Sequence, residues 1–441
     1  MSSSRALRDV VFVFAAAYAC LWTSFVVINA ANMPLMDDYD AILAFINDYA
    51  DAGSSKRVAL VMEQHNEHRI ATTRAAAALN YHMSGTVNFT YLILFGTALW
   101  MLACWLFIHE AACLGMPLFA LPFTALFLNL RYATLVNWAM AGLNHYTQAF
   151  FGFLCIFCLC RPPERETAWT RPLGYACLYL AAFSSGAGIL VVPVVGLYLV
   201  LARHSQRLPM LGLHAAVILG LNYVVYGYRS GSVLAAGFPL PQTLGVVQFF
   251  LYFCGNLLPA KLPCLCLGAV ALAAIMYCAS QRCDLRYPEY FFTAVLQMLV
   301  GLSAGIARIG FGPEYGMESK YGCYAILLWA SLIMMGARLM RDGSLKRYPE
   351  ASWLSVAGIV GLSIAVCGSS WIYNRQSIEN IAKVHWIVHP NEQHAREILQ
   401  VSAAKGIYDG RRYISNFDQR SESGSRREAP PQRDAGEGDD E

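Results

Sequence analysis

The sequence predicts an all-α polytopic membrane protein, and its composition and the lengths of its apolar runs are the basis for this fold class. Apolar residues make up 57% of the 441 residues and charged residues only 14%, whereas soluble domains contain about 25% charged residues. The apolar residues fall into many runs of about 17–25 residues, the length at which a helix crosses the hydrocarbon core of a bilayer. The net charge is only +3, so we expect the lipid bilayer as a partner and no nucleic acid.

We expect about 11 transmembrane helices from these runs and from the charges between them. The first run, 10–31, follows Arg5 and Arg8 and is long enough to span a bilayer. Because it lacks a clear cleavage site, we interpret it as a membrane helix with a cytoplasmic N-terminus rather than as a signal peptide. The other predicted spans are 88–108, 114–130, 143–160, 172–185, 186–202, 208–227, 262–280, 290–307, 321–338 and 352–373.

Four clusters of basic residues lie between these spans, and the positive-inside rule places all four in the cytoplasm. The clusters are Arg161/Arg165/Arg171, Arg203/Arg207, Arg282/Arg286 and Arg338/Arg341/Lys346/Arg347. This orientation requires 172–202 to be a tight hairpin that turns at 184–188, and 244–258 to lie on the outer interface rather than cross. It predicts an integral membrane protein whose C-terminus is on the outer side. Basic inner loops are compatible with a bacterial inner membrane or an endoplasmic reticulum membrane, and we favour the bacterial inner membrane, in which the C-terminus is periplasmic.

Three segments are expected in this topology. Residues 1–373 are predicted to form the transmembrane domain, including a long outer loop over 32–87. Residues 374–416 are predicted to form a small extracytoplasmic appendage with helical structure. The tail over 417–441 is rich in Ser, Gly, Pro and charged residues, a composition that is typical of disorder.

The outer loop begins with three carboxylates, Asp37, Asp38 and Asp40. Clustered carboxylates repel one another, which raises the pKa of one of them and suits it to act as a general base at the membrane surface. The alternative is a structural role, because Asp37 or Asp38 can cap the helix that follows. The apolar spacing over 40–52 predicts an amphipathic helix that lies on the bilayer.

A polar motif follows at 63–69 and leads into a second predicted helix through 75–78. We expect His65, His68 and Arg69 to share one helical face, because they are three and four residues apart. We interpret this face as a binding surface for a sugar or a phosphate. A solvated surface helix and a metal site are the alternatives, although the histidine spacing is not that of HExxH.

Polar residues also occur at the outer ends of later spans. Asn144, His145 and Gln148 enter an apolar run, and such groups at membrane depth usually face a cavity or bond to another helix. Arg308 ends one span and Lys320 begins the next, with several glycines between them. Two cations on the outer face oppose the positive-inside rule, which favours an anionic ligand such as a lipid phosphate. Snorkelling toward lipid headgroups is the alternative.

These features together resemble the GT-C superfamily of integral-membrane glycosyltransferases. The first span ends in Asp37-Asp38 where that superfamily keeps an acidic motif, and a long outer loop and many further spans follow. The segments 64–69, 308–312 and 319–321 are similar to recurrent features of bacterial members. The resemblance covers residues 10–373, and the C-terminal region lacks the large outer domain of several members.

The resemblance implies an enzyme that moves a sugar from a polyprenyl-phosphate donor to a hydroxyl of a lipid-linked glycan, glycolipid or polysaccharide, inverting the anomeric centre. A base must take the proton of the acceptor hydroxyl, and Asp38 is the first choice and Asp37 the second. Cations must stabilise the departing lipid phosphate. The residues expected to do so are Arg308, Lys320 and Arg69. The residues expected to orient the sugar or the acceptor are His65, Glu67, His68, Asn144, His145 and Glu314.

No cofactor is expected, because fixed cations can stabilise a phosphate leaving group; a divalent metal is kept as an alternative. Two other functions remain open. A membrane O-acyltransferase would use His65 or His145, but it would leave the acidic end of the first span without a role. A transporter or flippase for lipid-linked sugars would often show internal repeats, and the two halves of this chain have no visible similarity.

Overall fold

The computed structural model describes residues 2–66, 68–227, 240–343 and 349–422. Within these ranges the protein is an all-α membrane protein with one two-stranded sheet. Six helices are long and apolar enough to cross a bilayer: Arg8–Asn29, Phe89–Cys113, Ser205–Val225, Lys261–Ser280, Pro288–Phe311 and Ser319–Arg341. Three shorter apolar helices are Pro117–Phe127, Gly186–Leu201 and Thr243–Cys254. The count of about 11 spans stays a prediction.

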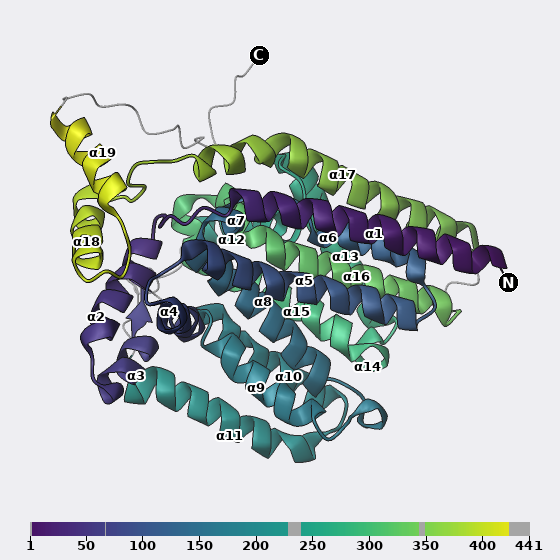
Figure 1. The fold of residues 1–441 in the computed structure, drawn as a ribbon. Helices are drawn as coiled ribbons and strands as arrows, with labels where there is room; N and C mark the ends of the chain where they lie inside the picture. The colour runs from purple at the N-terminus through teal and green to yellow at the C-terminus, as the bar shows by residue number, and fades with distance from the viewer. Residues whose placement is uncertain (1, 67, 228–239, 344–348, 423–441) are drawn as a thin grey trace.

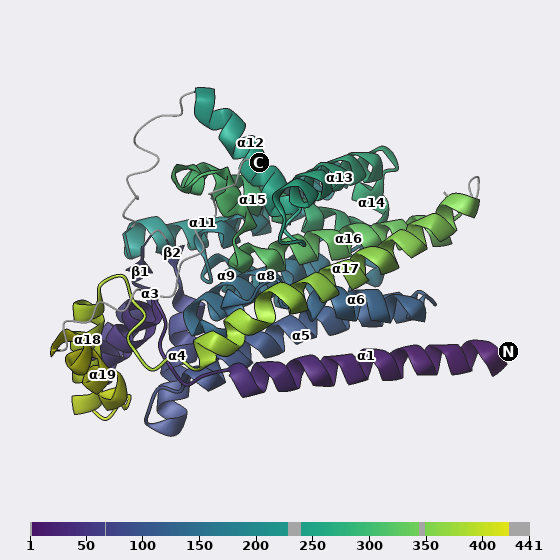
Figure 2. The ribbon, with the colours of Figure 1, turned by 90° about the horizontal axis from the view of Figure 1, so that it is seen from above.

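The long helices lie side by side, and the elements of the first loop gather at one end of the bundle together with α18 and α19 (Figure 1). The elements before residue 160 are α1 Ser2–Asn29, η1 Tyr39–Ala44, α2 Phe45–Asp51, α3 Ser54–Met62, β1 Gln64–His65, β2 His68–Arg69, α4 Ala71–Ser84, α5 Phe89–Cys113, η2 Pro117–Phe119, α6 Ala120–Phe127, α7 Thr134–Asn137 and α8 Ala139–Leu159. The view from above places the N-terminus at the opposite end (Figure 2).

The second part of the chain completes the bundle around α8 and α16. Its helices are η3 Pro163–Arg165, α9 Thr170–Ala182, η4 Gly186–Leu190, α10 Val191–Leu201, η5 Ser205–Arg207, α11 Leu208–Leu219, η6 Gly220–Val225, α12 Leu240–Cys254, α13 Lys261–Ser280, α14 Cys283–Arg286, α15 Pro288–Arg308, η8 Ile309–Phe311, η9 Pro313–Met317, η10 Ser319–Tyr321, α16 Gly322–Arg341, α17 Pro349–Ala382, α18 Glu392–Ala404 and α19 Arg411–Glu422. Every span predicted from the sequence corresponds to one or two of these helices.

Two of the basic clusters have a structural role at the end of the bundle opposite the first loop. Arg161 and Arg338 approach Glu110, with N···O distances of 3.4 and 3.7 Å. Arg338 also lies 3.9 Å from the buried Glu289. Buried carboxylates need such partners, because an uncompensated buried charge is strongly destabilising.

The helical structure of 172–202 is interrupted at the turn that the sequence predicts. Helix α9 ends at Ala182, and η4 begins at Gly186 and packs directly against α9. A Cβ atom on Gly188 would lie 1.8 Å from the carbonyl oxygen of Ala181. Only glycine therefore fits at this position, and the close approach holds the turn in place.

We expect Gly188→Ala to destabilise the protein, because the added methyl group must push η4 away from α9. Overpacking of this kind costs about 1–3 kcal/mol or more. Thermal unfolding of the purified protein in detergent would show a lower Tm. Gly212→Ala is the matched control, because a Cβ at Gly212 meets no atom within 4 Å. Equal Tm values for the two variants would contradict the packing argument.

The amphipathic helix predicted over 40–52 is present as η1 and α2, but its predicted place on the bilayer is wrong. Tyr39, Ile42 and Ile46 on its apolar face are buried in a core that α18 and α19 complete. The carboxylate of Asp40 bonds His389 Nε2 at 3.1 Å and His394 Nε2 at 2.8 Å. The apolar face is thus covered by the C-terminal part of the chain rather than by lipid.

The C-terminal boundaries also differ from the prediction. Residues 374–382 continue α17, and the appendage proper consists of α18 and α19. Residues 417–422, predicted to be disordered, belong to α19, whereas 423–441 lie outside the described residues.

The segment 244–258 forms most of α12, which packs against α13 and α15. A Cβ on Gly255 would lie 1.8 Å from the Cys264 carbonyl oxygen, and the indole of Trp329 donates to the Cys254 carbonyl at 3.0 Å. The end of α12 is therefore anchored inside the helix bundle. Its place on the outer interface stays a prediction.

Candidate functional site

The polar motif at 64–69 is a β-hairpin, so the helix predicted for it is wrong. Gln64–His65 pairs with His68–Arg69, and Asn66 in the turn has φ +49°. Asparagine tolerates this left-handed conformation better than most residues, which favours the tight turn. His65 and His68 are directly opposite each other and therefore share a face of the hairpin. Two residues three positions apart share a face in the predicted helix and also in the observed hairpin. Both histidines line one pocket.

Arg69, the next residue after His68, points away from this pocket, because successive side chains of a strand alternate. Its side chain is buried and donates to the side-chain oxygen of Asn222 at 3.0 Å and to the Gly227 carbonyl at 2.8 Å. Arg69 thus ties the hairpin to the end of η6 instead of lining the pocket as predicted. Glu67 lies outside the described residues.

The two adjacent aspartates occupy different environments. Residues 35–38 form a tight turn in which the Asp38 N–H bonds the Leu35 carbonyl at 2.9 Å, and Met36 has φ +49°. Asp37 lines the pocket, with its Oδ2 3.9 Å from Nε2 of His65. Asp38 is fully buried outside the pocket and accepts backbone N–H groups from Leu35 and Met140. Asp38, the first choice of base from the sequence, therefore lies outside the pocket, whereas Asp37, the second choice, lines it.

The surroundings of Asp37 and Asp38 shift their pKa values in opposite directions. The neighbouring His65 lowers the pKa of Asp37 below its usual range, and Lys320 and His389 add to this effect. Burial raises the pKa of Asp38 to about 8, against the opposing bonds from Leu35 and Met140. Asp37 is consequently the carboxylate that is both ionised at neutral pH and accessible from the pocket.

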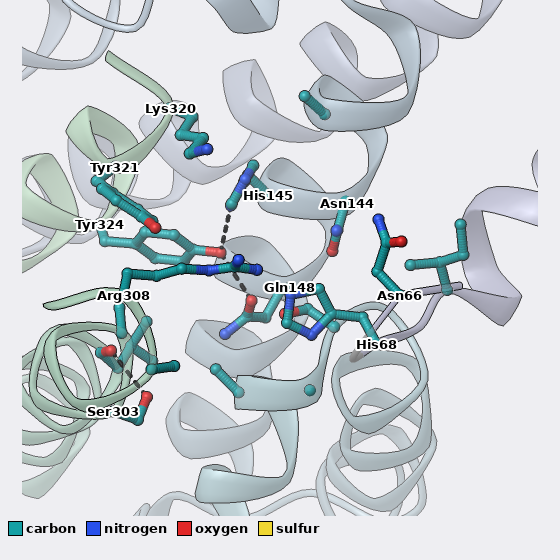
Figure 3. A pocket seen from close by; sticks show the side chains of 18 of the residues that line it. Asn66, His68, Asn144, His145, Gln148, Ser303, Arg308, Lys320, Tyr321 and Tyr324 are labelled. Atoms are coloured by element: carbon teal, nitrogen blue, oxygen red, sulfur yellow. Dashed lines mark hydrogen bonds between the residues drawn. The ribbon is translucent and has the colours of Figure 1, made fainter. Parts of the chain in front are cut away.

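Helix α8 forms one wall of the pocket with Asn144, His145 and Gln148. The Tyr324 hydroxyl donates to Oε1 of Gln148 at 2.7 Å and lies 2.9 Å from Nδ1 of His145 (Figure 3). Because the hydroxyl has one proton, Nδ1–H of neutral His145 donates to it, which leaves a lone pair on Nε2. Oδ1 of Asn144 is buried and has no hydrogen-bond partner within the described part of the chain. The wall therefore offers hydrogen-bond acceptors to a ligand.

The opposite wall carries the two predicted cations. Arg308 ends α15 and points into the pocket, and Lys320 in η10 approaches it from the other side of the reversal at Gly312 (Figure 3). The Lys320 ammonium donates to the Tyr315 hydroxyl at 2.8 Å and lies 4.8 Å from the centre of that ring. Glu314 instead faces Lys261, at an N···O distance of 3.6 Å, and lies outside the pocket.

The pocket has a volume of about 420 Å³ and combines polar groups with an apolar wall. The predicted residues that it brings together are Asp37, His65, His68, Asn144, His145, Arg308 and Lys320. Its apolar wall consists of Ala187, Ile189 and Leu190 from η4 and Val300, Ala304 and Ala307 from α15. Such a site suits a ligand that has an anionic group, several hydroxyls and an apolar part.

The sequence analysis assigned no role in the site to three aromatic residues that line the pocket, Trp138, Tyr321 and Tyr324. Tyr321 directly follows Lys320, and Tyr324 lies one helical turn later, so their spacing from the predicted cation was a usable signal. Trp138 precedes α8 and is separated from Asn144 by less than two turns. Aromatic faces beside hydrogen-bonding groups are suited to packing against the C–H face of a sugar ring.

Among the described residues, no group of three or more His, Cys, Asp or Glu side chains is arranged to hold a metal ion. Comparisons with protein-family models, curated proteins and solved structures give no match for this chain.

Proposed function

We propose that this membrane protein is a glycosyltransferase that moves a sugar from a polyprenyl-phosphate donor to a hydroxyl of a lipid-linked glycan, glycolipid or polysaccharide. The observation that carries the proposal is the meeting of an ionised carboxylate, Asp37, with two cations, Arg308 and Lys320, in one pocket. The resemblance to GT-C enzymes agrees with this arrangement. The site then faces the periplasm of a bacterial inner membrane.

The residues support an inverting displacement. Asp37 takes the proton of the acceptor hydroxyl as its oxygen attacks the anomeric carbon. The bond between that carbon and the phosphate oxygen breaks, and its electron pair leaves with the lipid phosphate. Arg308 and Lys320 stabilise the negative charge that develops on this leaving group. Asn144 and His145 accept hydrogen bonds from sugar hydroxyls and so orient the ring.

The apolar wall between η4 and α15 supports a lipid donor rather than a soluble nucleotide sugar. Leu190 and Val300 belong to this wall; η4 begins the apolar helix Gly186–Leu201, and α15 lies in a helix that is long and apolar enough to cross a bilayer. A lipid tail can pack there while its phosphate reaches Arg308. The extracytoplasmic position follows from the predicted topology, in which the first-loop elements lie outside.

The proposal predicts turnover with a defined donor. The purified protein in lipid nanodiscs is incubated with a panel of synthetic polyprenyl-phosphate sugars and an extract of envelope glycolipids. We expect one donor to be consumed and free polyprenyl phosphate to be released, with product detected by mass spectrometry. Movement of an unchanged donor across a vesicle membrane would favour the transporter alternative, and transfer of an acyl group would favour the acyltransferase.

A further inference from the structure

The buried carboxylate of Asp38 links the first outer loop to the start of α8. Its Oδ1 accepts the N–H of Met140 at 2.7 Å, and its Oδ2 accepts the N–H of Leu35 at 3.0 Å. Met140 is the second residue of α8, where backbone N–H groups lack partners within the helix. The local N-cap residue, Trp138, makes no side-chain capping bond. Asp38 therefore caps α8 from a position 102 residues earlier in the chain.

The same carboxylate also closes the turn that presents Asp37. The Asp38 N–H bonds the Leu35 carbonyl, and the Leu35 N–H bonds the Asp38 side chain, so the turn is held by two bonds. Met36 is kept in the left-handed region at φ +49°, a conformation that costs energy for a non-glycine residue. Both bonds oppose relaxation of this strained turn and keep Asp37 directed toward the pocket.

One side chain thus couples the two walls of the site. The turn at 35–38 carries Asp37, and α8 carries Asn144 and His145 within its second turn. Displacement of either element changes the distance between the carboxylate and the groups that orient a sugar.

We propose that Asp38 is a positioning residue that sets the geometry between Asp37 and α8, rather than a second acid–base group. The inference rests on the proposed function, because it concerns the distance between the base and the bound sugar. Misplacement of about 1 Å in such a site lowers turnover by about 100-fold. Asp38 exerts this effect without contact with the substrate.

Paired substitutions at the two aspartates test this role. An asparagine caps helices nearly as well as aspartate, but it is not a base. We expect Asp38→Asn, which keeps one acceptor, to retain kcat within about tenfold of the wild type, and Asp38→Ala to lose about 100-fold. Asp37→Asn and Asp37→Ala should lose activity equally, since neither contains a base. Equal and complete loss in both Asp38 variants, with activity kept in Asp37→Asn, would overturn the proposal.

Hydrogen exchange tests the link without any turnover. The Met140 amide should exchange about tenfold faster in Asp38→Ala than in the wild type, because its acceptor is lost. Asp48→Asn removes an exposed carboxylate from the same loop and should leave exchange unchanged. Unchanged exchange in Asp38→Ala would refute the cap.

Measurements of sugar transfer and of hydrogen exchange together separate this inference from the proposed function on which it rests. Binding of farnesyl phosphate should be equal in the Asp38 variants and the wild type, which shows that the variants are folded and that Arg308 and Lys320 remain in place. Absence of sugar transfer by the wild-type protein would refute the proposed function, whereas the exchange measurement would still decide whether Asp38 holds α8.

Discussion

Asp37→Asn is expected to lower kcat for sugar transfer by about 1,000-fold, because it removes the carboxylate that we propose takes the acceptor proton. The substitution conserves shape and can still form hydrogen bonds, so binding of the lipid-linked donor should change by less than about threefold. Single-turnover measurements with the donor bound in advance separate the loss of chemistry from any loss of binding. The carboxylate lies at the pocket surface, so the protein should remain folded.

The pH dependence of sugar transfer by the wild-type protein provides a second readout of this residue. A base is active when it is ionised, so kcat falls as the pH drops through the pKa of Asp37. His65 and Lys320 lower the pKa of Asp37, which places this acid limb below the ordinary aspartate value of about 3.9. The residual activity of Asp37→Asn should lack the limb.

Asp48→Asn is the matched control for this experiment. Asp48 is an exposed carboxylate in α2, on the same loop between α1 and α5, and lies outside the pocket. Its substitution should leave both kcat and donor binding unchanged. Full turnover by Asp37→Asn, or an unchanged acid limb in that variant, would remove Asp37 from the mechanism.

The location of the site could be predicted from the sequence because a membrane restricts where the ends of helices lie. The ends of spans on one side of a bilayer lie near one level, so Asp37, His145, Arg308 and Lys320 can come together in one pocket. The direction of a side chain within a turn could not be predicted. Asp37 and Asp38 are adjacent, and only the backbone conformation at Met36 decides which of them faces the pocket.

The element that covers the apolar face of 40–52 could not be predicted from the sequence either. The spacing over 40–52 shows that one face of this helix avoids water, and both lipid and protein satisfy that requirement. The structure covers the face with α18, some 350 residues later, through contacts such as Asp40 with His394. Nothing local to the helix encodes this long-range contact. Similarly, the three-residue spacing of His65 and His68 is compatible with a helix and with the observed hairpin.

The second large effect is expected at the two cations. Arg308→Ala and Lys320→Ala should each weaken binding of farnesyl phosphate by about 10- to 100-fold, because hydrogen bonds to a charged group contribute about 1.5–3 kcal/mol. Farnesol has the same tail without the phosphate, so its affinity should not change. The measurement is a titration of each lipid into the protein in nanodiscs, repeated at several salt concentrations.

The geometry of the two residues predicts how the substitutions combine. Arg308 and Lys320 reach the pocket from opposite sides of the reversal at Gly312, so both can contact one phosphate. Loss of either leaves the other in place, and the double variant should bind farnesyl phosphate no better than farnesol. Lys261→Ala is the control, because this cation faces Glu314 outside the pocket. If the phosphate affinity of the double variant matches that of Lys261→Ala, the leaving group is stabilised elsewhere, since Arg308 and Lys320 are the arginine and lysine that line the pocket among the described residues.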